Sequence, residues 1–280
     1  MTGSSRPVFL IVPAATLIGV FLVLPYLNIV VMSLRAPARS TPYGVGFSTD
    51  SYQKFFSDDY YLGALATTLW LGLLTTLVCL LLGFPVALQI ARASARWRAL
   101  LYGLVLSPLL VGIVVRSFGW TILLGNNGVI NRSLRNLGLI HTPLPLMYNS
   151  FGIVVALAHV FLPFMILPIL SALQLIDPVL QDAARSLGAS RATVFRRIVL
   201  PLALPGVQSG VILVFVLAVS SYVTPMLVGG MRVKTMAIIV VDTLLDQFQW
   251  PLGSALALML ALSTAAIVLL FVSLTRARWR

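Results

Sequence analysis

Six long apolar stretches divide this sequence. Each one is long enough to cross about 30 Å of hydrocarbon as a helix. Only 9% of the residues are charged, whereas a soluble domain carries about 25%. We therefore expect an all-α membrane protein with six transmembrane helices, near residues 8–34, 62–91, 99–124, 151–173, 206–228 and 253–275.

The basic residues between these stretches indicate the orientation. Lys and Arg are dense at both termini, in 92–98 and in 174–205, and sparser in 35–61, 125–150 and 229–252. Because Lys and Arg concentrate in cytoplasmic loops, we expect both termini in the cytoplasm and a multi-pass protein of the cytoplasmic (inner) membrane. The net charge of +12 then reflects topology. No nucleic-acid partner is expected, because the Arg residues are spread over span ends and do not gather on one face.

Several kinds of site are missing from the sequence. No acidic residue falls within an expected span, which weakens the case for a carrier driven by protons or sodium. His159 could titrate there, but a lone His on an apolar face is more often packed and hydrogen-bonded. There is no phosphate-binding Gly-rich loop and no catalytic or metal-ligand motif, and Cys79 is the single cysteine. We expect no enzyme activity, metal or cofactor in this chain, and keep a secondary transporter and a membrane enzyme as rival interpretations.

A polar segment at 177–201 interrupts the apolar pattern. Its opening Asp-Pro pair is a strong helix start, Gly188 suits the left-handed position after a helix, and Ser190 can cap a second helix. Leu200-Pro201 and Pro205 are expected to end that second helix before the fifth span. The segment is therefore predicted to form a helical hairpin with its tip at Gly188. Such a hairpin either lies on anionic headgroups or docks on a soluble partner.

The spacing within this hairpin resembles a known family. An acidic-Ala-Ala triplet is followed after three residues by Gly, and after nine more by Ile-x-Leu-Pro. This resembles the EAA loop of permease subunits in binding-protein-dependent ABC importers, with Asp182 where the family usually has Glu. The resemblance implies a type I ABC importer (MetI-like) permease fold and a hairpin that couples the spans to an ATPase. The implied coupling residues are Asp182, Ala183, Ala184, Gly188, Ile198, Leu200 and Pro201.

Further blocks resemble the spermidine/putrescine-type permeases, in particular the first of the two permeases that such systems encode. The same branch imports ferric iron, opines, aminoethylphosphonate and other small solutes. The resemblance implies a heterodimer with a second homologous permease, a dimer of cytoplasmic ATPases that hold ATP and magnesium, and an external solute-binding protein. It also implies a transmembrane core at 62–275, a first span and loop at 1–61, and a tail at 276–280. The blocks lie at 108–131, 163–165, 221–225, 229–230 and 250–255.

Arg116 is the one clear charge inside an expected span. Burying it at the middle of a helix costs about 2.5–3.5 kcal/mol on insertion scales. Its long stem either lets it reach the membrane interface, or it faces a subunit interface and holds an external gate by binding a carbonyl or an Asp. Trp120, one turn further on, is assigned to the same pathway or gate.

Hydroxyl groups gather in the fifth span, where Ser221, Tyr222 and Thr224 precede Pro225. Polar groups at a broken helix suit a water-filled route, and Tyr222 could offer its ring face to a cationic amine. Alternatively, the hydroxyls bond back to their own helix or to neighbouring helices. Ser221 stands where many relatives carry Asp, which bears on the substrate.

Asp242 lies four residues before Asp246 in the segment that precedes the last span. On a helix the two carboxylates would share a face. They either meet a polycation that leaves the binding protein, or they form a solvated face paired with Arg232 and Lys234.

Overall fold

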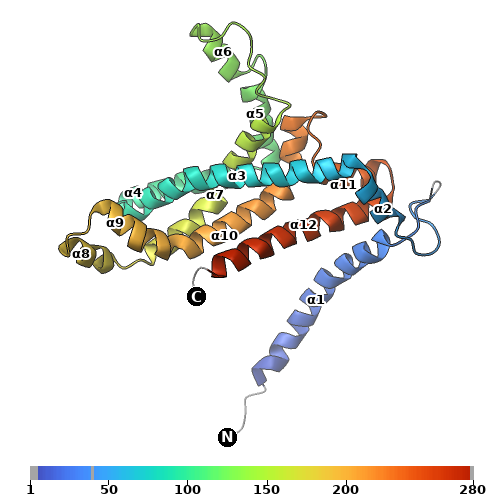
Figure 1. Cartoon of the computed structure of the whole chain (residues 1–280), viewed down its shortest axis with the longest axis horizontal. Helices are drawn as coiled ribbons and strands as arrows, with labels where there is room; N and C mark the ends of the chain where they lie inside the picture. The colour runs from blue at the N-terminus through green and yellow to red at the C-terminus, as the bar shows by residue number, and fades with distance from the viewer. Residues whose placement is uncertain (1–5, 39–40, 278–280) are drawn as a thin grey trace. The chain divides into compact units, whose positions relative to one another are not determined.

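The computed structural model describes residues 6–38 and 41–277, and these residues are almost entirely helical (Figure 1). Their one β contact is an isolated bridge between Arg35 and Phe47, so the predicted all-α class is confirmed. The expected tail at 276–280 lies mostly outside the described residues. The helices are α1 (Arg6–Ser33), α2 (Asp50–Ser57), α3 (Asp59–Arg92), α4 (Ala95–Leu106), α5 (Ile113–Leu124), α6 (Val129–Asn136), α7 (Ser150–Gln174), α8 (Pro178–Ser186), α9 (Arg191–Val194), α10 (Leu200–Val219), α11 (Met236–Val241) and α12 (Trp250–Ala277).

Five of the described helices are long and apolar enough to cross a membrane. They are α1, α3, α7, the run Arg191–Val219 and α12. In place of a straight third span, the structure has a pair of helices bent by 94° between Leu110 and Ile113. Pro108 lies in the 3₁₀ turn before this bend, and Val111 is extended. The six apolar segments therefore form five continuous helices and one bent pair.

The chain divides into two compact units, of which the first contains Met1–Gly63 and Ile239–Ser263. In this unit most of the described side chains of α1 are exposed apolar groups, as expected for a helix that faces lipid or another subunit. The guanidinium of Arg35 lies over the rings of Tyr43 and Phe47, 5.7 Å and 5.3 Å from their centroids. These contacts hold the loop that follows α1 against the end of the helix.

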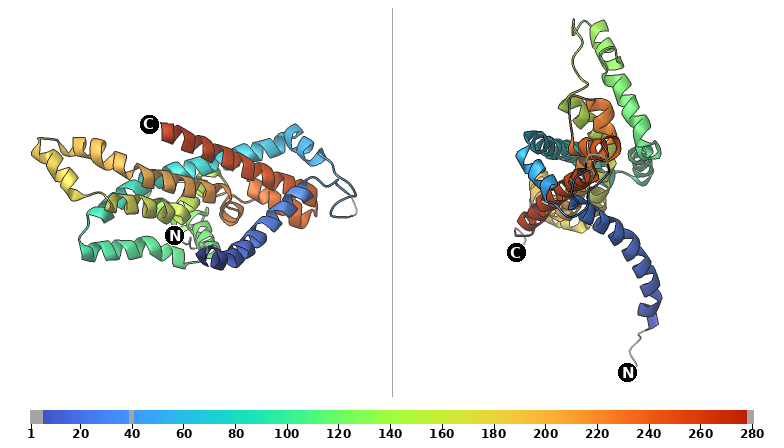
Figure 2. Two further views of the ribbon diagram at one scale, coloured as in Figure 1. Left: turned by 90° about the horizontal axis from the view of Figure 1, so that it is seen from below. Right: turned by 90° about the vertical axis from the view of Figure 1, so that its right-hand side faces the viewer.

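The second unit, Ala64–Ile238 and Thr264–Arg280, has its core along α7. α10 runs beside α7 (Figures 1 and 2) and approaches it closely. A methyl group at Gly206 would lie 2.5 Å from the carbonyl oxygen of Pro168, and one at Gly210 would lie 2.8 Å from the Met165 sulfur. Small residues that bring two backbones together are the usual way for membrane helices to associate. The largest fully buried side chains of α7 are Ile153, Leu157, Val160, Met165, Ile166, Ile169 and Leu170.

Candidate functional site

The predicted hairpin is present, with its first arm in α8 and its tip at Gly188. The Asp177 carboxylate accepts a hydrogen bond of 2.9 Å from the Val179 N–H, and the Ser190 hydroxyl accepts one from the Thr193 N–H. Gly188 has φ +83°, the left-handed conformation expected after a helix end. The predicted caps and turn are therefore confirmed.

The second arm differs from the prediction, because Pro201 does not end it. Arg191–Val219 forms one run of helix that passes through Pro201 and Pro205 into the fifth span. A π-helical turn at Phe195–Val199 precedes the first proline, and there the Leu200 N–H donates to the Phe195 carbonyl, five residues back. This wider turn changes the hydrogen-bond pattern just before the proline, so the missing N–H leaves no break.

The two arms differ in how they are held. The second arm is anchored, because Val194 and Val199 are buried and the ring of Phe195 packs edge-on against Phe84 of α3 at 5.9 Å between centroids. The first arm, α8, has no buried residue. Leu187, beside the tip, is 89% exposed and Val179 is 66% exposed. The hairpin thus presents unburied apolar side chains on a segment that the other described residues leave uncovered.

The implied coupling residues are divided between the arms. Asp182 and Ala183 are exposed on α8, and Ala184 is half-buried and packs against the core. Ile198, Leu200 and Pro201 are half-buried on the continuous second arm. Gly188 therefore joins an exposed acidic arm to one that leads directly into the membrane.

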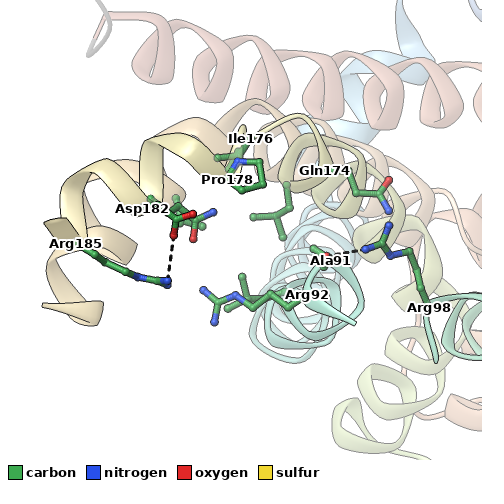
Figure 3. Close-up of a pocket in the computed structure, with 12 residues that line it drawn as sticks. Ala91, Arg92, Arg98, Gln174, Ile176, Pro178, Asp182 and Arg185 are labelled. Atoms are coloured by element: carbon green, nitrogen blue, oxygen red, sulfur yellow. Dashed lines mark hydrogen bonds and ion pairs between the residues drawn. The ribbon is translucent and has the colours of Figure 1, made fainter. Parts of the chain in front are cut away.

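A pocket of about 590 Å³ lies between α8 and the ends of α3 and α7 (Figure 3). Asp182 lies at this pocket and forms an ion pair of 3.5 Å with Arg185. Arg98 also lines it and donates from Nη2 to the carbonyl oxygens of Ala91 and Ala93, at 3.3 Å and 3.0 Å. In the sequence, Arg92 and Arg98 are recognisable only as topology signals, because their convergence on one pocket depends on tertiary packing.

The predicted pathway residues of the fifth span lie where the helix is interrupted. The interruption falls at Ser220–Tyr222, a few residues earlier than Pro225. The Ser220 hydroxyl bonds back to the Val216 carbonyl at 2.7 Å. The Thr224 hydroxyl is fully buried and lies 3.0 Å from that of Ser117 on α5. These two side chains follow the expected alternative, in which hydroxyls serve helix contacts.

The remaining polar side chains at this interruption have no such partners. The Ser221 hydroxyl is buried and has no hydrogen-bond partner among the described residues. Tyr222 is half-buried. Among the predicted pathway residues of the fifth span, Ser221 and Tyr222 are therefore those whose polar groups the surrounding described helices leave available.

Arg116 and Trp120 lie on the same helix, α5. Within the described residues, the Nε and Nη1 atoms of Arg116 are buried and have no hydrogen-bond partner. Trp120 donates from its ring N–H to Nδ1 of His159 on α7 at 3.2 Å. His159 is therefore hydrogen-bonded, as expected, but its side chain is exposed and not packed in the core. The contact also places the Arg116 helix against α7.

Asp242 belongs to the other compact unit. Its carboxylate accepts a hydrogen bond of 3.0 Å from the side-chain amide of Gln247, and the stretch Asp242–Asp246 is a π-helical turn. Asp246 is exposed. Both residues remain accessible in part.

Comparisons with known proteins agree over nearly the whole chain. Residues 2–278 match the family described as the inner membrane component of binding-protein-dependent transport systems. The spermidine/putrescine transport system permease protein PotB of Escherichia coli (strain K12) is 31% identical over 91% of this chain and 94% of the relative. PotB of Haemophilus influenzae is 29% identical over 90% and 87%. The molybdenum transport system permease protein ModB of Mycobacterium bovis is 30% identical over 70% and 72%.

A solved structure shares the fold. The crystal structure of a bacterial ABC transporter involved in the import of the acidic polysaccharide alginate superposes with a TM-score of 0.80 at 18% identity. The match covers 96% of this chain and 94% of that chain, and at this identity it bears on the fold alone. Because residues 2–278 match this family, the chain belongs to the inner membrane components of binding-protein-dependent transport systems, and is a transport permease, not an enzyme.

Proposed function

We propose that this chain is one half of the membrane route of an ATP-driven importer whose cargo is a polyamine such as spermidine or putrescine. The cargo class is supported by the PotB relatives, which resemble this chain along nine-tenths of its length. A second homologous permease completes the route. An external solute-binding protein delivers the cargo, and a pair of cytoplasmic ATPases supplies the energy.

The observation that carries the proposal is the hairpin of α8 and α9. Its tip and first arm expose apolar side chains, above all Leu187 and Val179, beside the polar residues Gln181, Asp182 and Arg185. Exposed apolar groups rimmed by polar residues mark a surface that binds another protein. With both termini in the cytoplasm, this surface faces the ATPases. ATP and magnesium bind on those subunits, since this sequence has no phosphate-binding loop.

The same hairpin supplies a path from the ATPases to the membrane. The acidic arm docks, and the anchored arm continues as one helix from Arg191 to Val219. At the far end of this helix lie Ser221 and Tyr222, with the Ser117–Thr224 contact next to them. Closure of the ATPases around ATP therefore moves the region where the hydroxyl groups gather, and the route opens alternately to the two sides.

A cationic cargo gives Arg116 a specific role. Two unit charges of like sign at 4 Å repel by about 4 kcal/mol at an effective dielectric constant of 20. Arg116 therefore does not bind a polyamine directly. Its unpaired N–H groups require an acceptor, which a carbonyl or carboxylate of the second permease supplies, and the pair acts as a gate. Tyr222 is the residue in this region that suits an amine, through its ring face.

One observation favours a second cargo class. An unpaired guanidinium beside the route suits an anion as well as a gate. The ModB relative, from a molybdenum transport system, shows that chains this similar serve other solutes. Aminoethylphosphonate is the member of the branch whose phosphonate would pair with Arg116, and ferric iron and opines complete the alternatives.

Reconstitution with the partner subunits tests the proposal. Proteoliposomes should take up labelled spermidine only when ATP reaches the ATPases and the binding protein is present. Collapsing proton and sodium gradients should leave uptake unchanged. Uptake that survives without ATP but stops when the gradients collapse would identify a secondary carrier. Uptake of aminoethylphosphonate in preference to spermidine would support the ATP-driven importer but reject a polyamine as its cargo.

A further inference from the structure

The pocket in Figure 3 carries an excess of positive charge. Three guanidinium groups, from Arg92, Arg98 and Arg185, line it with a single carboxylate, from Asp182. Among the described residues Arg92 has no hydrogen bond or ion pair, and the Nε of Arg98 is buried without a partner. Arg92 and Arg185 extend into the same open space (Figure 3). Like charges that converge in this way repel each other unless an anion lies between them.

The walls of the pocket add a second property. Apolar side chains line it alongside the Arg residues, and three of them, Leu173, Ile176 and Val199, are buried. The pocket also lies at the ends of α3 and α7, two helices that are long enough to span the membrane. The end of a spanning helix lies at the depth of the lipid headgroups. The apolar wall residues are Leu88, Ala91, Leu173, Ile176, Pro178 and Val199.

We propose that this pocket binds a phosphate-bearing anion, and that the apolar walls favour the headgroup of an acidic phospholipid as its source. Guanidinium groups bind phosphate oxygens in a bidentate manner, and basic pockets between membrane helices suit such headgroups. Arg92 belongs to α3 and Arg185 to α8, so one phosphate between them ties the hairpin to the span ends. The amides of Gln174 and Gln181, which also line the pocket, supply further donors.

The consequence for transport rests on the proposed function, whereas the binding site does not. α8 has no buried residue of its own, so a bound headgroup would be a large part of what fixes its position. A fixed α8 transmits ATPase movement to the second arm. Without the headgroup, more ATP would be hydrolysed for each solute imported.

Binding is tested on the full-length chain purified with its partner subunits. Native mass spectrometry with added dioctanoyl phosphatidylglycerol should show retained lipid, and dioctanoyl phosphatidylcholine should be retained far less. Arg92→Gln should weaken phosphatidylglycerol retention about tenfold or more, the loss expected when a charged hydrogen-bond partner is removed. Arg96→Gln is the matched control, because Arg96 is an exposed Arg near the same helix end that does not line the pocket. Equal retention by both variants overturns the proposal.

A second experiment distinguishes the two sources of phosphate. Inorganic phosphate is added in competition with phosphatidylglycerol. If it fails to displace the lipid, the lipid is the source. If inorganic phosphate displaces the lipid, and Arg92→Gln abolishes this displacement, the site accepts soluble phosphate. In nanodiscs, adding phosphatidylglycerol to phosphatidylcholine should raise solute transported per ATP in wild type but not in Arg92→Gln. Because lipid retention needs no transport, failure of the proposed function leaves the binding result standing.

Discussion

Gly188 and Arg116 are single residues whose surroundings explain why they have the side chains they have. Gly188 has φ +83°, and a methyl group built on it would meet nothing within 4 Å. Glycine is therefore needed here for the left-handed backbone conformation, and not because a larger side chain would be crowded. Arg116 has buried N–H groups without acceptors in the described part of the chain. Gly188 serves a turn within the chain, whereas we propose that Arg116 meets an acceptor on the second permease.

Replacing Gly188 tests docking at the tip. Asn and Asp both tolerate the left-handed conformation, so Gly188→Asp and Gly188→Asn differ mainly in charge. We expect Gly188→Asp to insert normally into the membrane and to lose most ATP-driven uptake, while Gly188→Asn keeps a substantial part. Uptake in proteoliposomes and the amount of inserted chain are the measurements. Normal uptake by Gly188→Asp would count against contact between this tip and the ATPase.

Replacing Arg116 tests the gate. Arg116→Ala removes the donors, and Arg116→Lys keeps the charge but loses the planar fork that pairs with a carboxylate. We expect uptake to fall about tenfold or more in Arg116→Ala, for the loss of a charged hydrogen bond, and by less in Arg116→Lys. Arg132→Ala, at an exposed Arg on α6, should behave as wild type. Wild-type uptake in both Arg116 variants would remove this residue from the mechanism.

At the scale of the elements, the hairpin divides into what the sequence can and cannot predict. Asp177, Gly188 and Ser190 act on groups a few residues away, and all three roles follow from the sequence alone. Pro201 was expected to end a helix, because the rule for proline assumes ordinary α-helical bonding. The π-helical turn before it changes that bonding, and no local pattern in the sequence announces such a turn.

Longer-range features escape the sequence for a different reason. Arg92 and Arg98 are visible as basic residues at a span end, but the pocket they line also requires α7 and α8 to lie beside them. The pairing of Ser117 with Thr224 joins residues that are more than a hundred positions apart. Composition and spacing predict which residues are polar, whereas packing decides which of them meet.

The contact between α7 and α10 yields a stability prediction. Gly206→Ala places a methyl group against the Pro168 carbonyl, so we expect a loss of about 1–3 kcal/mol, the usual cost of overpacking. Gly103→Ala is the control, because a methyl group there meets nothing within 4 Å and α4 gains about 0.5–1 kcal/mol from replacing Gly. Thermal unfolding followed by tryptophan fluorescence in detergent is the measurement. An unchanged midpoint in Gly206→Ala would show that the two helices can separate at little cost.

At the scale of the whole molecule, the predicted orientation in the membrane decides whether the hairpin is a cytoplasmic element. The density of Arg at alternate connecting segments predicts this orientation. Cys79 is fully buried, and its thiol donates to the Ala158 carbonyl at 3.5 Å. Because a buried thiol reacts poorly, single cysteines can be added as probes without removing it.

Labelling with a membrane-impermeant maleimide checks the orientation. Ser186→Cys, on the exposed end of α8, should react only in inside-out vesicles. Ser133→Cys, exposed on α6, should react only in right-side-out vesicles. Wild type should remain unlabelled in both. The reverse pattern would place the hairpin outside and exclude contact with any cytoplasmic ATPase.

The continuous helix from Arg191 to Val219 has a mechanical consequence. Its 29 residues extend about 43 Å at 1.5 Å per residue. If such a rod pivots about its anchored end near Phe84, a tilt of about 10° displaces the far end by about 7 Å, which exceeds one helical turn of 5.4 Å. The helix is thus a lever arm, in which a small rotation imposed at the membrane surface becomes a displacement large enough to exchange one packing arrangement for another near Ser221.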